Sequence, residues 1–173
     1  MPHDHLRVLA HPLRMRILSL LTGTAMSAAE AARELGETQA NTSYHLRRLH
    51  DAGLLEVAEE VEIRGGRAKR YRHNPESGKR LTSRDPGEER LLTKAIAAEL
   101  LRRADSRAAQ RPASLTDAEL WVAPEVWARL LKQATELSQE LHDAAQPPRT
   151  PGTVRVSASV ALFELTAGSA ESQ

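Results

Sequence analysis

Apolar residues recur at steps of three and four between Leu6 and Leu21, which is the spacing of one face of an α-helix. Pro12 interrupts this stripe, and proline fits best in the first turn of a helix, where its missing N–H costs little. The pattern therefore predicts one short helix to about Ala10 and a second from about Pro12 to Leu21.

Two further helix starts follow. Ser27-Ala-Ala-Glu30 has the form of a capping box, and Gly36 supplies a stop after the helix that this box opens. Thr38 is the next expected N-cap, for a helix over about 39–52 that Gly53 terminates. Two helices joined by a short turn that contains glycine match the spacing of a helix-turn-helix motif.

The helix over 39–52 has one polar and basic arc. At about 100° per residue, placing Thr42, Leu46 and Leu49 inward leaves the opposite arc for hydrogen-bonding and cationic side chains. The members of this arc and its flank are Gln39, Ala40, Asn41, Ser43, Tyr44, Arg47 and Arg48. Such an arc is either an ordinary solvated face or a surface suited to the major groove of DNA.

The next segment predicts a β-hairpin. Apolar residues alternate with polar ones from Leu54 to Ile63, and Gly65-Gly66 separates this run from a second one, Ala68 to His73. The hairpin tip is rich in bases, and residues 64–72 hold Arg64, Arg67, Lys69, Arg70 and Arg72 without an acid.

Acids on the first strand are expected to neutralise part of this charge. A two-residue turn at the glycines places Glu62 opposite Lys69 and Glu59 opposite Arg72. In that register, Arg64 and Arg67 are left to meet phosphate.

Three stretches, LRVLAHPLRMRILSLL, NTSYHLRRLHDAGLLEV and IRGGRAKRYRH, together resemble the winged helix-turn-helix domain of ArsR-type bacterial transcriptional regulators. The resemblance covers about residues 5–75. It implies that the 39–52 helix enters the major groove, that the hairpin wing contacts the backbone or minor groove, and that the protein is a homodimer. The expected DNA-binding residues are Gln39, Asn41, Ser43, Tyr44, His45, Arg47, Arg48, Arg64, Arg67 and Lys69.

Two positions in this helix carry a second interpretation. Thr42 stands where such domains commonly have an apolar residue, so its packing is expected to differ. His45 either packs at the flank of the helix or donates to a phosphate. A catalytic pairing of Ser43 with His45 is disfavoured, because residues two apart on a helix point in directions about 200° apart.

Residues 86–111 form a predicted long helix after a polar linker. Its apolar stripe includes Leu91, Leu92, Ile96 and Leu100, which pack either on the protein's own core or on a second copy. The resemblance favours dimerisation through these residues.

The pattern of apolar residues over 112–166 predicts a small β-α-β unit. We expect this unit to sense a ligand or to assemble the dimer. Alternation over 154–162 indicates a strand, Leu115 to Ala123 a shorter one, and Pro124 opens the helix between them. The aromatic residues Trp121, Trp127 and Phe163 are either core or the lining of an apolar pocket. Residues 167–173 are expected to be a flexible tail.

The fold predicted as a whole is α+β: a mainly helical winged helix-turn-helix domain over 1–80, a dimerisation helix over 86–111 and the β-α-β unit. The 24 basic and 23 acidic residues are unevenly divided, with 13 bases and 10 acids in residues 1–80 against 11 and 13 in the remainder. This segregation suits a DNA-facing first half.

The chain contains no cysteine, which excludes thiolate metal ligands and a cysteine nucleophile and fits a reducing, cytoplasmic setting. The 86–111 helix also lacks histidine, so metal sensing of the kinds usual in ArsR-type regulators is disfavoured, although His3-Asp4-His5 is a weak candidate. No apolar run is long enough to cross a bilayer.

The sequence thus predicts a non-enzymatic, sequence-specific DNA-binding regulator without a cofactor. We expect it to be a homodimeric repressor that binds a double-stranded operator and responds to a small-molecule effector. The alternative is a winged-helix module that binds proteins and has lost DNA binding.

Overall fold

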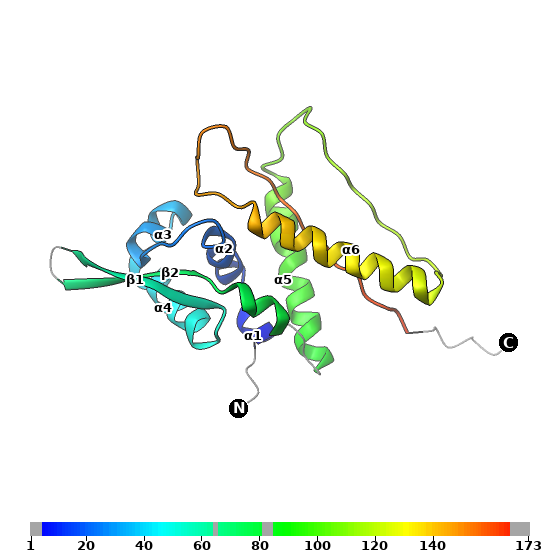
Figure 1. Cartoon of the computed structure of the whole chain (residues 1–173), viewed down its shortest axis with the longest axis horizontal. Coiled ribbons are helices and arrows are strands. Elements are labelled where there is room, and N and C mark those ends of the chain that lie inside the picture. The colour runs from blue at the N-terminus through cyan, green and yellow to red at the C-terminus, as the bar shows by residue number, and fades with distance from the viewer. Residues whose placement is uncertain (1–4, 64–65, 81–84, 167–173) are drawn as a thin grey trace.

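The computed structural model describes residues 5–63, 66–80 and 85–166 (Figure 1). The predictions for His3, Asp4, Arg64 and the tail over 167–173 lie outside this described part. The helices and strands, in chain order, are α1 His5–Leu9, α2 Pro12–Leu20, α3 Ala28–Leu35, α4 Gln39–Asp51, β1 Leu55–Ile63, β2 Gly66–His73, the 3-10 turn Pro75–Arg80, α5 Pro86–Ala104 and α6 Pro124–Asp143.

The predicted helix starts in the first half are confirmed by their caps. Pro12 is the first residue of α2, and the His11 side chain accepts a hydrogen bond from the Leu13 N–H at 3.2 Å. The capping box of α3 is complete, because the Ser27 N–H donates to Glu30 Oε2 at 2.7 Å and the Glu30 N–H donates to Ser27 Oγ at 3.3 Å. Thr38 caps α4 through the Asn41 N–H at 3.2 Å.

One apolar cluster holds α1, α2 and α4 to the start of β1. Ile17, Leu21, Leu46, Leu49 and Leu54 are fully buried at its centre. Full burial of a leucine or isoleucine side chain contributes about 1.5–3 kcal/mol, so this cluster is the main stabilising feature of the domain. It also fixes the inward face of α4, and thereby the face that α4 turns outward.

The hairpin forms as predicted, in a different register. Ile63 is opposite Gly66, whereas a turn at the two glycines would place Ile63 opposite Ala68. Gly66 has φ +147°, a conformation that side-chain-bearing residues rarely adopt, which lets β2 begin at this position. A bulge between Val57 and Glu59 then shifts the pairing again. The predicted pairs Glu62–Lys69 and Glu59–Arg72 are therefore wrong.

The helix α5 ends earlier than predicted, at Ala104 and not near residue 111. Gln110 has φ +56°, in the left-handed region, and Arg111 precedes Pro112, a position disfavoured in the helical conformation, so the helix does not reach residue 111. The helix packs on α1 and α2. Leu92 and Ile96 lie on its half-buried side, whereas Leu91 and Leu100 remain 48% and 44% exposed.

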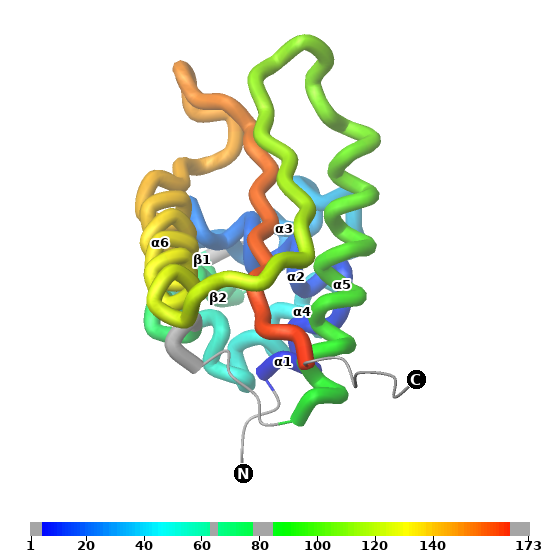
Figure 2. The backbone as a smooth tube through the Cα atoms, turned by 90° about the vertical axis from the view of Figure 1, so that its right-hand side faces the viewer, coloured from blue at the N-terminus to red at the C-terminus, as the bar shows by residue number. Residues whose placement is uncertain are grey.

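The C-terminal region contains the predicted helix, α6, but not the predicted flanking strands. Within the described residues the sheet consists of β1 and β2 alone. Residues 112–122 and 154–166 are extended segments that run between α5 and α6 (Figure 2). Neither segment makes a backbone–backbone hydrogen bond in the described part of the chain. An extended segment forms a β-strand only when a neighbouring segment exchanges backbone hydrogen bonds with it, and no described segment of one copy does so here.

Candidate nucleic-acid interface

The outward face of α4 carries the side chains that the helical period placed there. Gln39, Asn41, Arg47 and Arg48 are exposed, Ser43 is half-buried, and Tyr44 is 52% exposed. A large aromatic ring held half in solvent beside two guanidinium groups is unusual for a purely solvated face. The arrangement can form hydrogen bonds to base edges and charge-assisted bonds to phosphates.

Contacts along α4 orient two of these side chains. Arg47 Nη1 donates to Ser43 Oγ at 3.2 Å, one helical turn away. Asn41 Nδ2 donates to Glu37 Oε2 at 3.3 Å, which places a carboxylate at the edge of the face. The sequence analysis did not include Glu37, although its spacing of four residues from Asn41 indicates that the two can meet.

His45 lies on the inner side of α4 and is only 7% exposed. Its ring lies 4.6 Å from the His11 ring and 5.1 Å from the Tyr44 ring, centroid to centroid. Burial lowers the pKa of His45, and His11 and Arg14 lower it further. Of the two interpretations of His45, the structure shows packing at the helix flank, where it supports Tyr44 and the N-terminus of α2.

The wing bases are largely paired with acids. Arg67 Nη2 lies 3.3 Å from Glu60 Oε2, and Arg72 Nε donates to Glu56 at 2.6 Å. Arg67 was expected to be unpaired, and this is wrong because the shifted register brings Glu60 within its reach. Its side chain is still 70% exposed, so the ion pair is held in solvent and is weak. Lys69 is exposed and forms no ion pair with the described residues.

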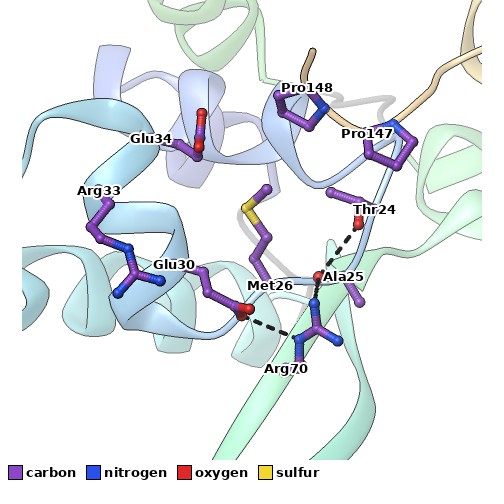
Figure 3. Close-up of a pocket in the computed structure, with 9 residues that line it drawn as sticks. All are labelled: Thr24, Ala25, Met26, Glu30, Arg33, Glu34, Arg70, Pro147 and Pro148. Carbon is purple, nitrogen blue, oxygen red and sulfur yellow. Dashed lines mark hydrogen bonds and ion pairs between the residues drawn. The ribbon is translucent and has the colours of Figure 1, made fainter. Parts of the chain in front are cut away.

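Arg70 acts as a clamp between the wing and α3, a role that the sequence analysis missed. It donates to Glu59 Oε1 at 2.6 Å. It also donates to the Ala25 carbonyl at 2.6 Å and to Glu30 Oε2 at 3.2 Å (Figure 3). The Ser27 backbone N–H, followed by the Ser27 side chain and Arg70, lowers the pKa of Glu30, so this carboxylate stays ionised. Since Glu30 closes the capping box of α3, one carboxylate fixes both the helix and the wing.

Backbone bonds join the wing to the same region. The Met26 N–H donates to the Tyr71 carbonyl at 2.9 Å, and the Tyr71 N–H donates to the Met26 carbonyl at 2.8 Å. Because α3 precedes α4 by a short turn, these bonds and the Arg70 clamp fix the wing relative to α4. In Figure 1 the wing extends past α3 and α4, on the side of the molecule away from α6.

A cavity of about 230 Å³ lies between α3, residues 24–26, Arg70 and the Pro147-Pro148 segment (Figure 3). Its volume falls below the range of about 300–1,000 Å³ usual for small-molecule pockets. Its charged groups already pair with one another through Glu30 and Arg70. The cavity is therefore a junction between the helix-turn-helix region and the segment after α6.

Direct contacts hold this junction. Arg149 Nη1 donates to Glu34 Oε1 of α3 at 2.8 Å. A Cβ at Gly23 would collide with the backbone of Gln146, so this close approach requires glycine. The His142 ring of α6 lies 5.5 Å from the His73 ring at the end of β2, and burial followed by His142 lowers the pKa of His73.

Within the part of the chain that the structure describes, no three histidine, cysteine or acidic side chains gather as metal ligands do. No helix there has both the length and the apolar character needed to cross a bilayer.

A capped helix α3, a tight turn, a helix α4 with a polar outward face and an antiparallel hairpin together define a winged helix-turn-helix fold of the α+β class. Residues 9–58, from the last residue of α1 into β1, match the family model of a helix-turn-helix domain. No curated protein matches the chain. The match and the fold indicate a DNA-binding regulator.

Proposed function

We propose that this protein is a sequence-specific transcriptional regulator of the ArsR type that acts as a cytoplasmic homodimeric repressor. The single observation that carries the proposal is the outward face of α4, where Gln39, Asn41, Tyr44, Arg47 and Arg48 are all exposed. A solvated helix needs no such concentration of hydrogen-bonding side chains and cations. We propose no enzymatic activity and no cofactor.

The dimensions of α4 suit the major groove. Its 13 residues make a rod about 20 Å long that the groove admits, with the N-terminal residues Gln39 and Asn41 leading. In a dimer, two such helices about 34 Å apart read successive major grooves. Arg67 and Lys69 of the wing then serve phosphate contacts, and His45 serves packing alone.

Control by an effector requires that the C-terminal region be coupled to α4. The Arg149–Glu34 ion pair and the contact of Gln146 with Gly23 connect the segment after α6 to the helix-turn-helix region. A ligand that favours a different position of this segment would change how α3 and α4 are presented to DNA. We propose that repression is relieved by this route and that the effector does not bind through thiolates.

Binding to the DNA upstream of the protein's own gene is the direct test, by gel shift with the full chain. We expect a discrete complex with this region at a protein concentration that leaves unrelated DNA free. Tyr44→Ala should reduce the difference between the two DNAs, whereas Tyr71→Phe, a change in the wing that leaves the α4 face intact, should preserve it. Absence of binding to this region and to genomic fragments at low salt would overturn the proposal.

One observation favours the alternative, a winged-helix module that binds proteins. Glu56, Glu59 and Glu60 of β1 neutralise Arg72, Arg70 and Arg67 across the hairpin, which reduces the attraction of the wing for phosphate. A chain that binds no DNA at low salt but retains a folded α4 face would support this alternative.

A further inference from the structure

The C-terminal region exposes far more apolar surface than a folded monomer does. Leu115, Trp121 and Val154 are 92%, 94% and 82% exposed, and Val156 and Phe163 are 69% and 63% exposed. Isolated exposed leucines are common on protein surfaces, but a run of this kind that includes a tryptophan is not. This apolar surface belongs to residues 112–165 and the end of α5, and is called the C-terminal apolar face below.

The total surface shows the size of the excess. The chain exposes 13,387 Å² for a mass of 19.0 kDa, whereas a folded monomer of that mass exposes about 8,400 Å². The difference exceeds the amount of about 1,000–2,500 Å² per copy that large obligate dimers bury.

The extended segment over 154–162 contacts a helix on each side, although all of its residues remain exposed. Val160 and Leu162 line a cavity of about 200 Å³ with Leu131 and Ala134 of α6. On the other face Arg103 of α5 donates to Ser159 Oγ at 3.0 Å. Figure 2 shows the segment between the two helices. A strand with helices on both faces normally has neighbours in a sheet, because its backbone groups otherwise lack partners.

The segment over 115–122 has the matching pattern. Three of its even positions, Ala118, Leu120 and Val122, are apolar, as are the even positions of 154–162. Its odd positions carry Asp117 and Glu119 at the centre and the apolar Leu115 and Trp121 toward the ends, and the odd positions of 154–162 carry Arg155, two serines and an alanine. Paired side by side, the two segments would present one apolar face to α6 and opposite charges on the other face, where cross-strand ion pairs stabilise a sheet.

We propose that a second copy of this chain occupies the C-terminal apolar face, and that residues 112–123 and 153–165 of both copies pair edge to edge into one shared sheet. Two strands alone are rarely stable, whereas the four that two copies supply, with a helix α6 from each, make a covered layer. A two-fold axis brings the same patch of each copy together, so self-complementary pairing of this kind closes at the dimer.

This inference rests on the homodimer in the proposed function but requires no DNA for its test. Sedimentation velocity and light scattering of the full chain without DNA should give twice the 19.0 kDa of one copy at micromolar concentration. Hydrogen exchange followed by mass spectrometry should show that amides of 154–162 exchange at least 100-fold more slowly than those of an unpaired peptide.

Two adjacent substitutions locate the interface. Val156→Glu adds a charge to the apolar face and should raise the dimer dissociation constant at least 100-fold, with loss of amide protection in 154–162. Ser157→Glu adds the same charge to the polar face, near Arg155, and should leave the dimer intact. Because Val156 is 69% exposed in a single copy, its substitution should not unfold the helix-turn-helix region, and amide protection of α2 and α4 checks this.

Three results would overturn the inference: a monomer at micromolar concentration, a dimer whose 154–162 amides exchange at the unprotected rate, or equal effects of the two substitutions. A monomer that captures an apolar dye would indicate an unlike partner on this face. The two proposals can fail separately, since a dimer that binds no DNA refutes only the proposed function, and a monomer that binds its operator refutes only the shared sheet.

Discussion

Arg67 at the wing provides a quantitative test of how the protein meets DNA. Its side chain is 70% exposed and forms a solvent-exposed ion pair with Glu60 at 3.3 Å. Arg67→Ala should remove one phosphate contact per copy and two per dimer. Each phosphate contact contributes about 0.9 to the slope of log K against log salt, so the slope should fall in magnitude by about 1.8. At 0.1 M salt this corresponds to at most about a 60-fold loss of affinity.

Glu60→Gln should have the opposite effect. It releases Arg67 from its ion pair and removes a negative charge near the phosphates. Exposed ion pairs contribute about 0.2–1 kcal/mol, so binding should tighten by up to about fivefold per copy. The two substitutions change the same ion pair but should change DNA affinity in opposite directions. Loss of folding would weaken binding in both, so it cannot explain this pair of results.

Fluorescence anisotropy measures these effects on a labelled operator duplex and on a scrambled duplex, between about 50 and 200 mM salt. Lys132→Ala is the control, since Lys132 is an exposed base paired with Glu136 on α6, away from the wing. The reasoning is refuted if the salt slope of Arg67→Ala equals that of the wild type, or if the loss is confined to the operator.

Three further predictions concern α4 and its support. Tyr44→Ala should lower the preference for the operator over scrambled DNA by about 1–3 kcal/mol, with little change in salt slope, as measured by competition binding. Thr42→Val should raise the free energy of unfolding by about 1–2 kcal/mol in urea, because Thr42 is fully buried and its hydroxyl makes no hydrogen bond. Burial is the main reason why the pKa of His11, His45 and His73 is lowered. The folded protein therefore favours the neutral forms of these histidines, and protonating them destabilises the fold. The histidine contribution to the free energy of unfolding should therefore be fully present above about pH 6.5. It should fall as the pH drops through the lowered pKa values, by at most about 1.4 kcal/mol per pH unit for each histidine. Denaturation at several pH values measures this loss.

Controls distinguish these effects from general ones. Thr93→Val removes a hydroxyl that donates to the Glu89 carbonyl at 2.9 Å on exposed α5, and should give no gain in stability. His45→Gln should reduce the pH dependence. Loss of stability in Thr42→Val, or a pH profile that His45→Gln leaves unchanged, would contradict the packing described for α4.

Local signals in the sequence predicted the first half of the fold well. The helix starts at Pro12, at Ser27 with Glu30, and at Thr38 are each marked by hydrogen bonds between residues no more than three apart in the chain. These helix starts can therefore be predicted without knowledge of a distant partner. The inward face of α4 was predicted for the same reason, because the helical period alone determines which of its residues share a side. The exposed positions of Asn41 and Tyr44 follow from it.

Features that depend on a distant partner were predicted less well. The register of the wing depends on the pairing of Ile63 with Gly66 and on a bulge between Val57 and Glu59, and a shift of this kind changes every cross-strand pair. Arg67 was therefore assigned as unpaired although Glu60 lies beside it. Arg70 contacts Glu30 at a separation of 40 residues, which no local pattern indicates.

By itself, the sequence determined the helix-turn-helix, the presence of the wing and the alternating pattern over 154–162, because these depend on residues close together in the chain. Only the tertiary structure decided that His45 packs on His11, that the wing arginines meet acids, and that 154–162 lies between α5 and α6 with open edges. A strand needs a neighbour, and the pattern of one segment records its faces but not the partner for its backbone.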